Sequence, residues 1–183
     1  AYAAMRRSGL AHPNSLALHW TIGSTLFALF GAGLLGLAHT WPAVNKWTHG
    51  TLITAMHGHA AFYGAYAMIV LAMITYVLPK MTNRSEKGTT LGYWAFWLQL
   101  AGMFGMTLSF ATAGIGQVYL ERIMGMGYLD AQLKIQVHFI MLIATASIFT
   151  IGVALFIYDF FRYRPHFETS DEIEAIDKET LQR

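Results

Sequence analysis

The stretch TLITAMHGHAAFYGAYAMIVLAMITYVLP, residues 51–79, decides the fold class of this chain. It contains no Asp, Glu, Lys or Arg, and about 20 apolar residues are enough for a helix to cross a hydrocarbon core of about 30 Å. Three further stretches, 8–45, 88–120 and 135–158, are equally free of these charged residues. The pattern predicts an all-α membrane protein with four transmembrane helices at 14–39, 51–79, 91–119 and 133–161.

The overall composition supports a membrane protein and excludes several soluble classes. Of the 183 residues, 55% are hydrophobic and 12% are charged, whereas about a quarter of an ordinary soluble domain is charged. Little sequence remains outside the charge-free stretches, which argues against a separate soluble domain, a Rossmann-type enzyme or a nucleic-acid partner. The predicted environment is the lipid bilayer.

The distribution of charge predicts the orientation and divides the chain into three parts. Nine Lys and Arg residues lie on one side of the spans, against Lys46, Arg122 and Lys134 on the other. This bias predicts that both termini are cytoplasmic. Residues 1–13 are predicted to be the end of a preceding helix and a cytoplasmic connector, so that Ala1 is internal to a longer chain. The four-helix transmembrane segment at 14–161 is then followed by an acidic cytoplasmic tail, 162–183, expected to be loosely ordered or to form a helix on a partner.

The four prolines, Pro13, Pro42, Pro79 and Pro165, are predicted to bound the spans rather than interrupt them. Glycine and alanine are dense along the spans, and their spacing predicts close helix packing.

Histidine is the residue type most suited to carry chemistry here. The sequence has eight histidines and no cysteine, so a heme or metal would be held by His, Met, Tyr or a carboxylate. His57, His59 and His138 fall inside the membrane, where a histidine is costly unless it has a function or a polar partner. Side chains two apart on a helix point about 200° apart, so His57 and His59 are predicted to leave opposite faces and to hold different centres. The alternative is two buried histidines satisfied by neighbouring polar groups.

Residues 48–70 resemble the tenth transmembrane helix of the large subunit of cytochrome c-dependent nitric oxide reductases, relatives of the heme-copper oxidases. The similarity continues in short segments on both sides, at 36–40, 43–45, 83–85, 94–98 and 114–118. It covers most of residues 1–160 and corresponds to helices nine to twelve, preceded by the end of helix eight at 1–7. The resemblance therefore implies one part of a twelve-helix bundle.

The resemblance also implies roles for the two central histidines. His57 corresponds to the proximal ligand of the high-spin heme b in the catalytic site, and His59 to an axial ligand of the low-spin heme b. Four polar residues near the start of the second span are then suited to hydrogen-bond the heme propionates, although a helix cap explains Thr48 equally well. These residues are Asn45, Thr48, His49 and Thr51.

The family's remaining ligands are not found in this sequence. Its non-heme iron is held by three histidines and a glutamate from helices six and seven, and the second low-spin heme ligand comes from helix two. The chain is thus expected to be an incomplete catalytic subunit, with the remaining helices of the same subunit and a membrane-anchored cytochrome c subunit as partners. His138 and the acidic tail have no counterpart role in the family.

The implied activity is reduction of two NO to N2O and water by a multi-pass protein of the bacterial inner membrane. Three alternatives stay open at this point. One is the quinol-dependent form of the same enzyme, and another is a non-catalytic cytochrome b anchor with one heme between His59 and His138. The third is a heme-free assembly or interaction subunit.

Overall fold

The computed structural model describes residues 12–82 and 85–162, together with Arg7 and Gly9. Four helical runs in it are long and apolar enough to cross a membrane: Ser15–Thr40, Leu52–Met81, Thr90–Ile123 and Gln136–Phe161. The prediction of an all-helical chain with four spans is confirmed, and its boundaries differ by four residues or fewer. The predicted end of a preceding helix at 1–13 lies mostly outside the described residues, as does the predicted acidic tail at 162–183.

Two of the four spans are α-helices interrupted by a π-helical segment, written η, and a third ends in one. In a π-helix each N–H bonds to the carbonyl five residues back. The first span consists of α2 (Ser15–Phe27), η1 (Ala28–Leu34) and α3 (Leu35–Thr40), and the second of α5 (Leu52–Ala61), η2 (Phe62–Ala67) and α6 (Met68–Met81). The third and fourth are α7 (Thr90–Gln117) with η3 (Val118–Ile123), and α9 (Gln136–Phe161).

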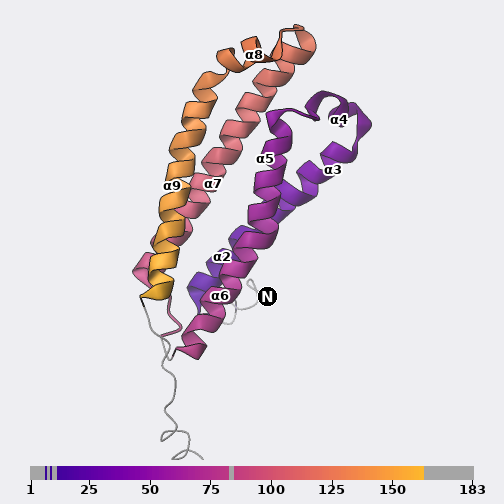
Figure 1. The fold of residues 1–183 in the computed structure, drawn as a ribbon. Helices are drawn as coiled ribbons and strands as arrows, with labels where there is room; N and C mark the ends of the chain where they lie inside the picture. The colour runs from indigo at the N-terminus through magenta and orange to yellow at the C-terminus, as the bar shows by residue number, and fades with distance from the viewer. Residues whose placement is uncertain (1–6, 8, 10–11, 83–84, 163–183) are drawn as a thin grey trace, which may run out of the picture.

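The spans run side by side, and two short helices mark one end of the bundle (Figure 1). These are α4 (Pro42–Thr48) and α8 (Tyr128–Lys134), each within a connection for which the sequence predicts only a loop. We call this end the α4/α8 end. The third helix, α7, packs against α5 on one side and along α9 on the other.

Two predicted span boundaries were wrong for identifiable reasons. The third span does not stop at residue 119, because the π-helical segment η3 carries it on to Ile123. The fourth begins at Gln136 rather than at residue 133, because residues up to Lys134 belong to the separate helix α8.

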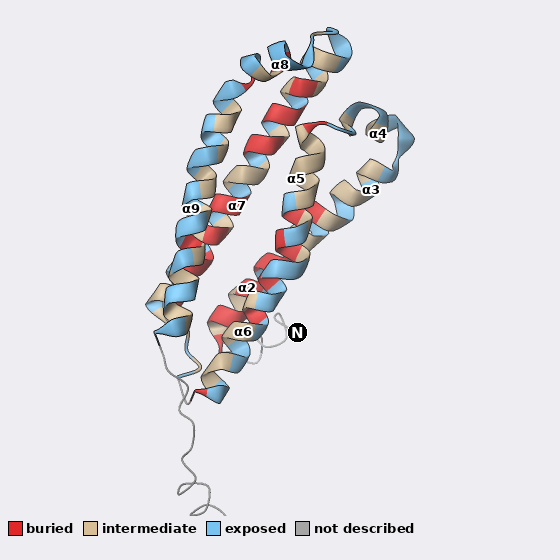
Figure 2. Cartoon of the chain, viewed as in Figure 1, coloured by how far each residue is buried: buried red, intermediate tan, exposed pale blue. Residues whose placement is uncertain are grey.

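The buried surface is concentrated on α7 rather than shared evenly. Figure 2 shows buried residues along α7, whereas α9 is exposed over most of its length. Among the residues of α9, Gly152 is the buried one. The exposed side chains of α9 are mainly apolar, so this face is suited to lipid or to further transmembrane helices.

A buried glutamine joins three of the spans. Gln99 is 2% exposed, and its Nε2 donates to the carbonyl of Gly152 in α9 at 3.2 Å. Its Oε1 accepts from the hydroxyl of Tyr63 in η2 at 3.3 Å. Close approach makes these bonds possible, since a Cβ added to Gly102 would lie 2.5 Å from the backbone nitrogen of Phe149. The close packing predicted from the small residues is therefore present between α7 and α9.

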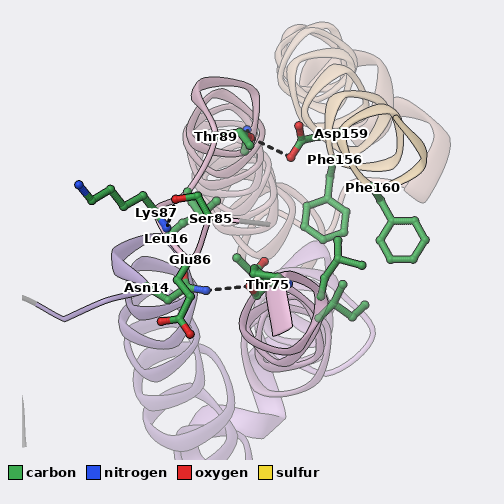
Figure 3. A pocket seen from close by; sticks show the side chains of 15 residues that line it. Asn14, Leu16, Thr75, Ser85, Glu86, Lys87, Thr89, Phe156, Asp159 and Phe160 are labelled. Atoms are coloured by element: carbon green, nitrogen blue, oxygen red, sulfur yellow. Dashed lines mark hydrogen bonds between the residues drawn. The ribbon is translucent and has the colours of Figure 1, made fainter. Parts of the chain in front are cut away.

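Pro79 was predicted to end the second span, but it lies inside α6, which continues to Met81. A proline has no N–H to donate to the carbonyl four residues earlier, here that of Thr75. The Nδ2 of Asn14 donates to this carbonyl at 2.9 Å, as Figure 3 shows. The Oδ1 of the same side chain accepts from the amide of Ala17 at 2.9 Å and so caps α2. One buried amide thus begins the first span and replaces the bond that Pro79 removes from the second.

The same end of the bundle holds α9 to the start of α7. The hydroxyl of Thr89 donates to Oδ2 of Asp159 at 2.8 Å and accepts from the amide of Gly92 at 2.9 Å (Figure 3). Thr89 is thus both the N-cap of α7 and the partner of a carboxylate on α9.

Replacing Asn14 by alanine is expected to destabilise the assembled protein. The variant loses a cap, which is worth about 1 kcal/mol, and strands a buried carbonyl, which costs about 1–3 kcal/mol. Denaturant-induced unfolding in detergent measures the loss. Asn14→Asp keeps the capping acceptor but not the donor and should lose less. Pro79→Ala returns an N–H to the Thr75 carbonyl, so Asn14→Asp should cost less still in that background; an equal cost in both backgrounds would contradict the assigned bond.

Candidate functional site

The two histidines of α5 face different helices. The ring of His57 meets the first span, where its Nδ1 lies 2.7 Å from the carbonyl oxygen of Gly31. The ring of His59 meets α7, where its centroid lies 4.8 Å from that of Phe110. The opposite-face geometry predicted from the spacing is therefore what the packing shows.

The π-helical segment η1 makes the carbonyl of Gly31 available to His57. In an α-helix the amide of Leu35 would bond to Gly31, four residues earlier. Here that amide bonds instead to Phe30, five residues earlier. The Gly31 carbonyl is thereby released from the helix ladder and accepts from the imidazole of His57.

The second span repeats this arrangement in the reverse direction. The amide of Met68 bonds to Tyr63, five residues back, which releases the carbonyl of Gly64. The hydroxyl of Ser24 in α2 donates to that carbonyl at 2.6 Å. Each of the two spans therefore presents a freed glycine carbonyl to a side chain of the other.

The crossing of these two spans requires glycine. A Cβ added to Gly31 would lie 2.6 Å from the Cβ of Ala60, and one added to Gly64 would lie 2.2 Å from the Cβ of Phe27. The sequence identifies these positions as packing residues. It does not identify the π-helical segments, because they have no sequence pattern comparable to a helix cap.

Both histidines keep Nε2 available for a ligand bond. A carbonyl oxygen only accepts, so Nδ1 of His57 carries the proton and its Nε2 has a lone pair. The same holds for His59, whose Nδ1 lies 2.9 Å from the carbonyl of Ala55. Metal-bound histidines commonly donate their other ring N–H to a carbonyl in this way. Between them, a Cβ added to Gly58 would meet nothing within 4 Å, so the chain's own atoms leave open space there. These residues fit axial ligation of two hemes.

The polar residues near the start of α5 play more local roles than the sequence suggests. Thr51, not Thr48, is the N-cap of α5, and its hydroxyl accepts from Ile53 at 3.3 Å and donates to the Thr48 carbonyl at 2.7 Å. The hydroxyl of Thr48 donates to Val44 at 3.1 Å. The capping explanation of Thr48 is therefore wrong. Of the four predicted propionate contacts, Asn45 and His49 are left with side chains not committed to the backbone in these bonds.

A polar cluster that the sequence does not reveal holds the start of α5 against the third span. The side chain of Gln117, 3% exposed, accepts from the amide of Leu52 at 2.9 Å and donates to Glu121 at 3.0 Å. The guanidinium of Arg122 donates to the carbonyl of His49 at 3.4 Å. Gln117 lies within a segment quoted for the resemblance, but its contact with Leu52 spans 65 residues and has no local signal.

His138 is not brought next to His59. Its Nδ1 lies 3.1 Å from the carbonyl of Ile135, at the start of α9. The helix α7 packs between α5 and α9, and His59 rests on Phe110 of α7. This packing lends no support to a heme held between the two histidines. Among the described residues there is also no group of three or more His, Cys, Asp or Glu arranged to hold a metal ion.

Four apolar spans with two outward-facing histidines on one helix define a multi-pass membrane protein of the heme-binding kind. Residues 2–157 match the family described as Cytochrome C and Quinol oxidase polypeptide I. The chain belongs to this family, the heme-copper oxidases, and membership implies heme as a cofactor.

A relative whose name refers to nitric oxide reduction matches most of this chain. The chain is 38% identical over 157 residues to the B-type subunit of the nitric oxide reductase of Stutzerimonas stutzeri. The match covers 81% of this chain and 33% of that protein. The chain therefore spans about a third of the length of this curated relative.

Proposed function

We propose that this chain is the part of a membrane nitric oxide reductase that supplies one axial histidine to each of two b hemes. The observation that carries the proposal is the pair His57 and His59. They lie two residues apart on α5, face different helices and each donate Nδ1–H to a backbone carbonyl. His57 is the ligand of the high-spin, catalytic heme, and His59 is a ligand of the low-spin heme that delivers electrons.

The bound hemes and a neighbouring non-heme iron would supply the metal centres at which two NO and two protons accept two electrons, giving N2O and water. The chain's own residues orient and insulate. The Gly31 carbonyl fixes the tautomer of His57 and increases the basicity of its Nε2. Tight glycine-mediated packing of the first two spans keeps water away from that ring.

The rest of the enzyme is proposed to come from outside this chain. The remaining helices of the same subunit hold the non-heme iron and the second low-spin ligand, in a twelve-helix bundle. With both termini cytoplasmic, the α4/α8 end lies on the opposite side of the bacterial inner membrane. Asn45 and His49 at that end hydrogen-bond heme propionates, and a membrane-anchored cytochrome c subunit delivers electrons from there.

A spectroscopic experiment on the purified holoenzyme tests this function. The dithionite-reduced protein should show b-type heme and should bind CO or NO at one heme while the low-spin heme keeps its spectrum. A reduced spectrum insensitive to CO would instead indicate a bis-histidine cytochrome b. A preparation without a Soret band would indicate a heme-free subunit. Turnover with reduced cytochrome c, compared with a quinol, separates the two forms of the reductase.

A further inference from the structure

We propose that His39 is a positioning residue for His57, whose stacked imidazole holds the His57 ring in one plane. The inference rests on the proposed role of His57 as a heme ligand and deepens it. The two rings are stacked, with centroids 5.2 Å apart and planes 24° apart. His39 comes from α3, so the contact joins the first span to the second.

His39 is itself held in place by its own helix. Its Nδ1 lies 2.8 Å from the carbonyl of Leu35, one turn earlier, and donates its proton to it. Its Nε2 is buried and has no hydrogen-bond partner among the described residues. A buried nitrogen without a partner is unfavourable, so filling space alone would be better served by an aliphatic side chain. What the imidazole adds is a flat ring whose orientation is fixed by Leu35.

The first span encloses the His57 ring on three sides. The Gly31 carbonyl holds Nδ1 at one edge, and His39 covers one face. A Cβ added to Gly36 would lie 3.3 Å from Cε1 of His57 and 3.9 Å from its Nε2. Rotation of the His57 ring would therefore break the bond to Gly31 or displace His39. All three contacts come from residues 31–39, within two to three helical turns.

The orientation of an axial imidazole and the strength of its Nδ1 hydrogen bond both affect its bond to iron. Resonance Raman of the reduced holoenzyme reports this bond directly through the iron–histidine stretching band of the high-spin heme. In His39→Leu the His57 ring is free to rotate and its bond to Gly31 weakens, so the band should broaden and move to lower frequency. High-spin heme content, measured by CO binding, should stay at the wild-type ratio. His39→Phe keeps a flat ring and should lie closer to the wild type.

Matched variants distinguish positioning from general disturbance. Gly36→Ala crowds the same ring from another side and should shift the same band with His39 intact. Phe110→Leu removes the ring beside His59 and should leave the high-spin band unchanged. If His39→Leu does not assemble, His39→Met provides a second side chain without a flat ring.

Three results would overturn the proposal. A wild-type band in both His39→Leu and His39→Met would show that the stacked ring has no effect on His57. A shift in His39→Phe as large as that in His39→Leu would show that the ring plane is not what matters. Absence of any iron–histidine band in the wild-type enzyme, despite bound high-spin heme, would instead refute His57 as the ligand and remove the basis of the inference.

Discussion

In a His57→Ala holoenzyme, the heme that binds CO or NO in the reduced state should be lost. Alanine offers no donor to iron, and the freed Gly31 carbonyl, 2.7 Å from Nδ1 in the native protein, has no replacement partner. Loss of a group that only hydrogen-bonds a metal ligand lowers metal affinity or activity about 10–100-fold. Loss of the ligand itself should therefore lower NO reduction by more than about 100-fold. CO-difference spectra and NO consumption measure the two effects.

A chemical rescue provides the control for His57. His57→Gly leaves space for free imidazole, which can replace the side chain as an axial ligand without changing the backbone path of α5. Added imidazole should restore part of the CO-binding spectrum in His57→Gly and none in the wild type. Full CO binding in His57→Ala without imidazole would contradict the assignment.

In a His59→Ala holoenzyme, the low-spin heme should lose its spectrum while CO binding at the other heme persists. The reason is geometric, because His59 lies against Phe110 of α7 and His57 against the first span. Turnover with the natural electron donor should fall by more than about tenfold, since electrons reach the catalytic heme through the low-spin one. Low-temperature reduced spectra and electron paramagnetic resonance separate the two heme types.

Two comparisons test whether the histidines act independently. His138→Gln should leave the low-spin spectrum unchanged, because α7 packs between the helices that carry His138 and His59. The variants His57→Ala and His59→Ala should each lose a different heme type. Loss of the same heme type in both would refute the two-face arrangement.

The predictions from sequence that succeeded depend on local properties. The four spans are identifiable because a charge-free stretch longer than the bilayer is thick is visible without knowing its neighbours. The opposing faces of His57 and His59 follow from the pitch of one helix. Close packing at Gly31, Gly64 and Gly102 follows from residue size alone, although the partners of these glycines do not.

The predictions that failed concern helix ends and interruptions. Pro79 suggests a boundary because a proline removes one bond from its own helix. The bond is replaced by Asn14, 61 residues from its partner Thr75. Thr48 and Thr51 are both credible caps in sequence, and only the backbone shows that Thr51 begins α5.

The sequence by itself determined that this chain crosses a membrane four times and carries two histidines on opposite faces of its second span. Only the tertiary structure decided what holds those histidines. The π-helical segment η1 releases the Gly31 carbonyl for His57, and the turn that follows it places His39 on the same ring. A π-helical segment lets a carbonyl leave its own ladder for a partner on another helix. Its position is therefore set by how two spans cross, a relation between distant residues that no single stretch of sequence contains.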